Sequence, residues 1–198
     1  MKKLAALLLA SLFFAGTALA QTPVRVRGSI DKLDGLSLVV NARDGSKVTV
    51  RLPDNFAVGG LTTAKLSDVT PGKFVGTAAM PQADGSLKAL EVLIFPDALR
   101  GTGEGHFPWD LQPQSTMTNA TVGDVVSGGD GPSLVLRYKD GEKKVSIPAG
   151  VPIVTFAPAD RSALHPGAHV FITARREADG SLTAPRVTVG LNGLAPPM

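Results

Sequence analysis

The chain contains one structural unit twice, and this repeat constrains its fold more than any other feature. The stretch Asp-Gly-Leu-Ser-Leu-Val-Val that begins at Asp34 returns 96 residues later, from Asp130, as Asp-Gly-Pro-Ser-Leu-Val-Leu. The stretch Ala-Asp-Gly-Ser-Leu-Lys-Ala that begins at Ala83 returns 95 residues later, from Ala178. Landmarks across the whole unit keep one register within a single residue, so both copies are expected to adopt the same fold.

Each unit has the pattern of an all-β domain. Short runs of alternating apolar and polar residues, as in Val48-Thr49-Val50, are separated by Asp-Gly pairs. Alternation indicates strands with one buried face, and Asp-Gly suits tight hairpins because both residues tolerate positive φ. The pattern predicts five strands per unit, at 24–33, 36–42, 47–52, 73–81 and 86–95, and at 121–128, 133–139, 143–148, 168–176 and 181–190.

A long connection joins the third and fourth strand of each unit. Residues 64–69 in the first unit and 159–164 in the second each favour a short helix or 3₁₀ turn, ended by a Pro-Gly pair. Five strands with one helical piece in this place are typical of an OB-type barrel. The sequence therefore predicts two tandem five-stranded OB-like barrels, with small Greek-key sandwiches as the alternative.

The domain organisation follows from the repeat and from the N-terminus. Residues 1–20 predict a cleavable secretory signal, because Lys2 and Lys3 precede a short apolar run that ends in Ala18-Leu19-Ala20. The first barrel is then expected at 21–95 and the second at 120–191, with an insert at 96–119 and a tail at 192–198. Export predicts the periplasm of a two-membrane bacterium. No later stretch is apolar enough for a membrane span.

Composition excludes some partners. The chain has no cysteine, so disulfides do not stabilise it and a packed core must. Of the 20 basic residues, two lie in the signal, which leaves 18 against 17 acidic residues, a net charge of +1. With this balance, one Trp and one Tyr, the chain lacks the basic surface and stacking aromatics of a nucleic-acid-binding protein.

The repeated Gly, Asp-Gly and Pro-Gly positions of the two units resemble those of a family of small exported bacterial domains of unknown function with an OB-like barrel. The resemblance rests on Gly28 and Gly123, the Asp-Gly hairpins, the Pro-Gly pairs and the Asp-Gly-Ser-Leu-x-Ala run, and it covers both units. The whole chain, with its insert, is similar to a bacterial group often labelled "metal ABC transporter permease". A permease crosses the membrane, and nothing after the signal can do so. The resemblance thus implies an OB-like fold and export from the cytoplasm.

The insert is the part that the repeat does not explain. It holds the only Trp of the chain, and its candidate binding residues are His106, Phe107, Trp109 and Asp110. A flexible linker favours Gly, Ser and charge, so these aromatic residues are expected to be packed. They could pack the insert against a barrel, line a ligand site between the barrels, or bind a partner protein of the envelope.

Metal binding is the alternative function. A copper site in a periplasmic accessory protein could use His106, Met117 and Met80, with Trp109 over the ion, because thioether sulfur suits Cu(I). No pair of these ligands has a recognised spacing, so no metal and no cofactor is expected as the first choice.

Catalysis ranks last among the expected functions. The chain has no Cys nucleophile and no Gly-x-Ser-x-Gly elbow, and although Glu104 and Asp110 flank His106, no nucleophile lies near them in the sequence. An envelope hydrolase is therefore the third hypothesis. The sequence favours a non-enzymatic, soluble periplasmic protein that binds a small ligand or scaffolds an envelope protein.

Overall fold

The computed structural model describes residues 22–128 and 131–198. The predicted signal peptide and its cleavage site lie outside the described residues, as does Asp130 of one predicted turn. The described chain is all-β, as predicted: its helical pieces are short 3₁₀ turns, and no helix in these two ranges is long and apolar enough to cross a membrane.

The strands follow the predicted pattern closely, with three additions and with the fifth predicted strand of each unit divided into two. The first unit forms β1 (Val24–Asp34), β2 (Ser37–Ala42), β3 (Lys47–Arg51), β4 (Ala57–Thr63), β5 (Phe74–Pro81), β6 (Leu87–Ala89) and β7 (Val92–Ile94). The insert adds β8 (Gly105–Pro108), and the second unit forms β9 (Thr116–Val126), β10 (Ser133–Tyr138), β11 (Gly141–Ser146), β12 (Ile153–Pro158), β13 (His169–Arg176), β14 (Leu182–Thr183) and β15 (Arg186–Gly190). The 3₁₀ turns are η1 (Leu66–Asp68), η2 (Asp97–Leu99), η3 (Arg161–Ala163) and η4 (Leu191–Gly193).

The local predictions from turn chemistry are confirmed. Gly45, Gly85 and Gly180 have φ of 84°, 81° and 83°, the left-handed conformation that their hairpins require. Next to Gly45, the Asp44 carboxylate accepts the backbone N–H of Ser46 at 2.9 Å, which fixes the turn. Turns η1 and η3 lie inside the two segments predicted to be helical.

Strand pairing closes two rings of five strands. The first barrel follows the order β1–β2–β3–β14–β13 and closes through pairing of β13 with β1. The second barrel follows the order β5–β6–β11–β10–β9 and closes through pairing of β9 with β5. Within each ring the positions run first, second, third, fifth and fourth, which is the Greek-key order of an OB-type barrel. The prediction of barrels is confirmed over the sandwich alternative.

The predicted tandem arrangement is not what the strand pairing shows, because the two units exchange strands. The first barrel takes β1–β3 from the first unit and β13 and β14 from the second, while the second barrel takes β5 and β6 from the first unit and β9–β11 from the second. The boundaries at 21–95 and 120–191 therefore separate repeats in the sequence and do not separate barrels. Such an exchange preserves the contacts of each barrel because the swapped elements are copies of one another.

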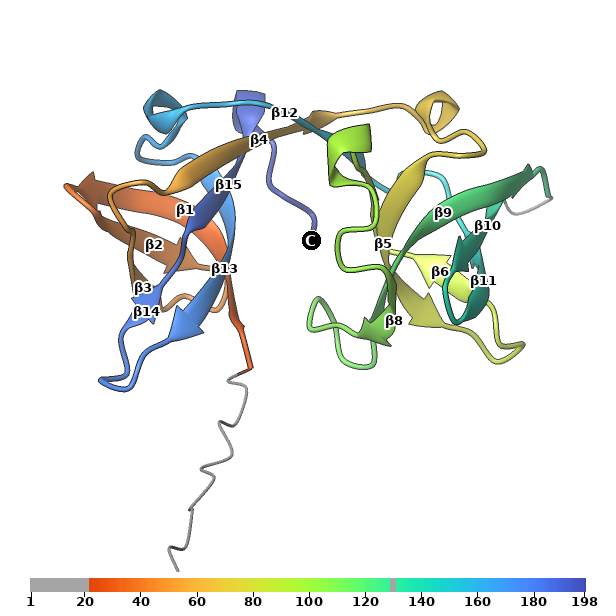
Figure 1. Cartoon of the computed structure of the whole chain (residues 1–198), viewed down its shortest axis with the longest axis horizontal. Coiled ribbons are helices and arrows are strands. Elements are labelled where there is room, and N and C mark those ends of the chain that lie inside the picture. The colour runs from red at the N-terminus through yellow and green to blue at the C-terminus, as the bar shows by residue number, and fades with distance from the viewer. Residues whose placement is uncertain (1–21, 129–130) are drawn as a thin grey trace, which may run out of the picture.

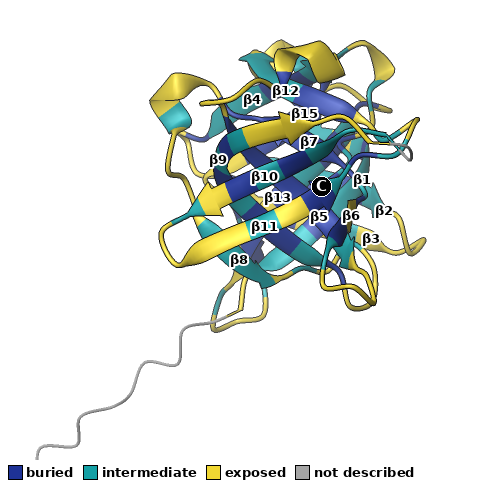
Figure 2. Cartoon of the chain, turned by 90° about the vertical axis from the view of Figure 1, so that its right-hand side faces the viewer, coloured by how far each residue is buried: buried dark blue, intermediate teal, exposed yellow. Residues whose placement is uncertain are grey.

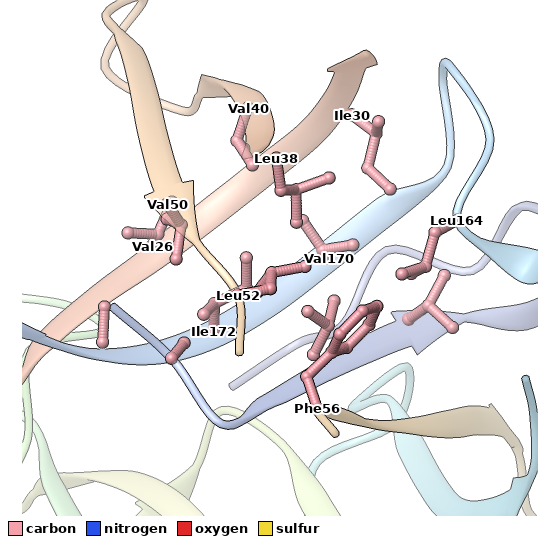
Figure 3. Packing of buried hydrophobic residues seen from close by; sticks show 14 of the residues in the cluster. Val26, Ile30, Leu38, Val40, Val50, Leu52, Phe56, Leu164, Val170 and Ile172 are labelled. Carbon is pink, nitrogen blue, oxygen red and sulfur yellow. The ribbon is translucent and has the colours of Figure 1, made fainter. Parts of the chain in front are cut away.

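Buried side chains confirm the exchange. In Figure 3, Val26 and Leu38 of the first unit lie against Val170 and Ile172 of the second, within one continuous core. These four side chains are at most 4% exposed. The second barrel has its own core, and Figure 2 shows buried and exposed segments alternating along β10 and β11 on its surface.

The exchange runs through two strands that the sequence did not predict. Strands β4 and β12 lie in the segments expected to be connections, pair with each other antiparallel, and cross from one barrel to the other (Figure 1). Strand β4 also pairs parallel to β15, and β12 pairs parallel to β7. The chain therefore runs straight across after β3 and after β11 instead of folding back. Strand β4 extends the sheet of the first barrel, β12 extends that of the second, and their pairing joins the two.

A third apolar cluster lies between the barrels. Its buried members come from both crossing strands and from their neighbours: Leu61, Phe74, Leu93, Phe95, Val154 and Met198. Residues 192–198, predicted as a plain tail, return to this place, and Figure 1 shows the C-terminal segment between the two halves. Arg27 Nε donates to the Met198 backbone oxygen at 2.5 Å, and Arg43 Nη2 donates to the Pro196 carbonyl at 2.8 Å.

Candidate functional site

The insert forms a β-hairpin on the second barrel. Strand β8 pairs antiparallel with the first residues of β9, so the second unit's first strand begins at Thr116, earlier than predicted. Trp109 lies just beyond β8, where its backbone N–H donates to the Ser115 carbonyl at 2.8 Å. The Ser115 hydroxyl donates back to the Trp109 carbonyl at 3.0 Å. The loop that carries Trp109 is thus held in one conformation.

From this loop, two side chains reach β1 of the first barrel. The Arg25 guanidinium lies 3.9 Å from the centre of the Trp109 ring, a cation–π contact. Asp110 accepts from Arg27 Nη2 at 2.7 Å and lies 3.5 Å from Arg25 Nη1. Burial acts to raise the pKa of Asp110, but the hydrogen bond from Arg27 and the two positive charges outweigh it, so the pKa is lowered. These contacts support the packing interpretation of the insert.

Beside this contact lies a cavity of about 380 Å³ between the barrels. Five aromatic side chains from both barrels and the insert line it: Phe95, Phe107, Trp109, Phe156 and Phe171. Exposed residues at its rim include Thr102 and Thr173, so the cavity opens to solvent there. Its volume and its mostly apolar wall with a few polar groups match small-molecule sites, which have volumes of roughly 300–1,000 Å³.

Glu91 is the acidic residue of this wall. It lies in the break between β6 and β7, facing the same way as Leu93 and Phe95, and it is fully buried. Its Oε1 accepts the Ala78 N–H at 3.3 Å, whereas its Oε2 has no hydrogen-bond partner among the described residues. Burial raises the pKa of Glu91 to about 8, against the smaller lowering effects of the Ala78 hydrogen bond and of the Arg27 charge. The carboxyl is therefore protonated at neutral pH.

Arg186 is the basic residue of the same wall. It stands 95 residues after Glu91, at the same position of the repeat. Arg186 is the first residue of β15, and Glu91 comes just before the first residue of β7, the corresponding strand. Strand exchange brings both residues to the same cavity. Arg186 is exposed at the rim, and no ion pair involving it is found in residues 22–128 and 131–198. The duplicated position therefore carries an acid in one half and a base in the other.

Three buried side-chain polar atoms lack a partner in the described part of the chain, and they lie in one region. They are Arg25 Nε, Glu91 Oε2 and Trp109 Nε1. Glu91 and Trp109 line the cavity, and Arg25 stacks on Trp109. Buried polar atoms are rarely left without partners in folded proteins, so these three atoms call for a partner from outside the chain, either ordered water or a ligand.

The structure brings some of the predicted site residues together and separates others. Phe107 and Trp109 line the cavity, with ring centres 6.1 Å apart, and Asp110 anchors the loop beside them. His106 faces away, because neighbouring residues of a strand point to opposite faces. Its Nδ1 lies 2.8 Å from the Thr118 hydroxyl, and burial lowers its pKa.

The proposed metal ligands do not form one site. Met117 pairs with Phe107 on the cavity face of the β8–β9 hairpin, whereas His106 pairs with Thr118 on the opposite face. Met80 lies near the end of β5 and does not line the cavity. Within the described ranges, no cluster of three His, Cys, Asp or Glu side chains could hold an ion. Strand alternation thus places His106 and Met117 on opposite faces of the hairpin, which does not favour the predicted grouping.

Glu91 and Arg186 are the site residues that the sequence did not reveal. One signal was present: Glu91 is the single charged residue within the apolar run Ala-Leu-Glu-Val-Leu-Ile, and Arg186 stands at the same place of the other repeat. Their meeting depends on the strand exchange, which no local pattern shows. Comparisons with protein-family models, with curated proteins and with solved structures found no match. The resemblance to exported OB-like domains stays a prediction.

Proposed function

We propose that this protein is a non-enzymatic binding protein of the periplasm, which holds a small, largely apolar molecule between its two barrels. The observation that carries the proposal is the aromatic cavity with unpaired buried polar atoms in its wall. The proposed location rests on the signal sequence in residues 1–20.

The surroundings of Glu91 support binding over catalysis. Its carboxyl is bonded to a backbone N–H, and in the described chain no His, Lys or Ser side chain is hydrogen-bonded to it. General acid–base or nucleophilic catalysis needs such converging groups. A fixed apolar wall that includes one buried carboxyl suits recognition of a ligand.

A fluorescent apolar probe tests the proposal. N-phenyl-1-naphthylamine, which brightens in apolar sites, is expected to bind the purified mature protein saturably with one site per chain. The Thr173→Phe substitution at the cavity rim should abolish this signal, because the added ring fills the cavity. Thr49→Phe is the matched control, since Thr49 is also an exposed strand threonine but does not line the cavity. Absence of saturable binding, or equal loss in both variants, would contradict the proposal.

The metal-binding alternative is tested with the single Trp as reporter. Because the predicted ligands face different ways, Cu(I), Zn²⁺ and Ni²⁺ are expected to leave Trp109 fluorescence unchanged. Saturable quenching with one ion per chain would revive the metal-binding hypothesis and count against an apolar ligand.

A further inference from the structure

We infer that the molecule held between the barrels is a carboxylate on an apolar body, hydrogen-bonded by Glu91 and Trp109 and paired in charge with Arg186. This inference rests on the proposed function and names the ligand class of that same cavity. The geometry points to it through three features of the cavity and its immediate surroundings: unpaired donors, positive charge, and an aromatic lining for the body of the ligand.

The unpaired atoms of this region are hydrogen-bond donors. An indole nitrogen such as Trp109 Nε1 only donates, and so does a guanidinium nitrogen such as Arg25 Nε. Glu91 Oε1 is already an acceptor of the Ala78 N–H, so the proton of the neutral carboxyl belongs on Oε2, the unpartnered atom. Donors without acceptors call for a ligand that supplies acceptor oxygens.

The charges around the cavity favour an anion. Arg25 and Arg27 on β1 pair with one side-chain carboxylate, Asp110, and Arg27 also donates to the Met198 backbone oxygen. Arg186 on β15 adds a positive charge at the rim, where no ion pair involving it is found among the described residues. Burial keeps Glu91 neutral at pH 7, so it does not offset these cations. A carboxylate would reduce the net positive charge, whereas an ammonium group would increase it.

The repeat explains how one cavity acquired these two groups. Glu91 and Arg186 occupy one position of the duplicated unit, and strand exchange places both copies of that position in the same wall. A protonated carboxyl and a guanidinium are both donors to a carboxylate, and the charge-assisted bond from arginine is the stronger of the two. Divergence at a single repeat position thus supplies two of the three polar contacts of the proposed ligand, and Trp109 of the insert supplies the third.

One apolar body with three different head groups tests the inference. The probes are 2-naphthoate, 2-naphthalenemethanol and 2-naphthylmethylammonium, titrated calorimetrically into the full mature protein at pH 7. The carboxylate is expected to bind at least about tenfold more tightly than the alcohol, and the ammonium more weakly than the alcohol. Preference for the ammonium or the alcohol overturns the inference but leaves the proposed function standing. Failure of all three probes and of N-phenyl-1-naphthylamine overturns both.

The pH dependence gives a second readout with a definite sign. A carboxylate needs Glu91 protonated, so its affinity should be steady from pH 6 to 7 and about tenfold weaker at pH 9 than at pH 7. A cationic ligand would need Glu91 ionised, and its affinity would rise over the same range. The charge that acts on Glu91 is that of Arg27, and Arg186 is the other charged residue of the cavity wall. Affinity that rises with pH contradicts the inference.

Two substitutions separate the contributions of the polar groups. Glu91→Gln keeps a neutral donor in place, so naphthoate binding should persist and its pH dependence should disappear. Arg186→Gln should weaken naphthoate about tenfold and leave the alcohol unchanged. Arg137→Gln is the matched control, because Arg137 is exposed on β10 and does not line the cavity. Loss of naphthoate binding in Glu91→Gln, or equal losses in Arg186→Gln and Arg137→Gln, would overturn the inference.

Discussion

The two barrels are alike inside and different where they face each other. Leu38 and Leu134 stand at one repeat position, and both are completely buried in their respective cores. At the facing surfaces, Glu91 corresponds to Arg186 and Phe95 corresponds to Gly190, each 95 residues apart. The insert hairpin also exists on one side only. Core positions stay apolar in both copies because each barrel must fill its interior. The facing surfaces are not under this constraint, so they can diverge and form an asymmetric site.

The largest expected effect concerns the matched cores. Leu38→Ala and Leu134→Ala should each cost about 2–5 kcal/mol of unfolding free energy, because both remove a fully buried side chain from a packed barrel. Urea denaturation of each variant measures the cost. Since each barrel contains strands of both units, a single unfolding transition is expected in both variants. Two separate transitions would show that the barrels are less interdependent than the exchange implies.

The duplicated polar position should behave differently in its two copies. The raised pKa means that folded Glu91 retains a proton that the unfolded chain releases, so its contribution to stability falls as pH rises from about 4.5 towards 8. The slope is about 1.4 kcal/mol per pH unit and flattens as the pH approaches 8, so the wild type should lose roughly 2 kcal/mol between pH 6 and 8, relative to Glu91→Gln.

The corresponding substitution in the other copy provides the control. Arg186→Gln should leave the pH dependence of the wild type intact, because Arg186 is exposed and is not among the groups that shift the pKa of Glu91. Urea unfolding of the wild type and both variants at pH 6, 7 and 8 gives the comparison. A wild type with the same stability at each pH would mean that Glu91 is ionised in the folded protein.

A smaller effect is expected at the insert. Trp109→Ala removes a half-buried ring that contacts Arg25 and Phe107, and it should cost about 2 kcal/mol of unfolding free energy. Thermal denaturation measures the loss, and the transition should stay single because the exchanged strands still join the barrels. An unchanged melting curve would indicate that the ring contributes to binding and not to packing.

The smallest effect is expected at the ion pair between the insert and β1. Asp110→Asn should cost less than about 1 kcal/mol, because Asp110 is 47% exposed. Asp97→Asn, which removes a more exposed pair with Arg100, is the control and should have no measurable effect. Chemical denaturation at low and high salt compares the two variants. Equal losses of unfolding free energy in the two variants would mean that the Asp110 contact with β1 stabilises the protein no more than the local Asp97–Arg100 pair does.

Sequence and structure agree where a feature depends on neighbouring residues. The Asp-Gly turns, the alternation around Val50 and the 3₁₀ turns before the Pro-Gly pairs were all predicted within a few residues. Strands β4 and β12 were missed because their residues make contacts mainly with distant segments. The insert was recognised as packed from its aromatic residues, but its partner on β1 depends on tertiary structure.

The sequence by itself determined the duplicated all-β unit, because side-chain alternation and turn chemistry act over a few residues. Only the tertiary structure decided which copy completes which barrel. The two copies present nearly the same strands, so either could fill either ring, and the choice follows from β4 and β12 crossing instead of turning back. That choice also decided the site, since it brings Glu91 and Arg186, 95 residues apart, into one cavity wall.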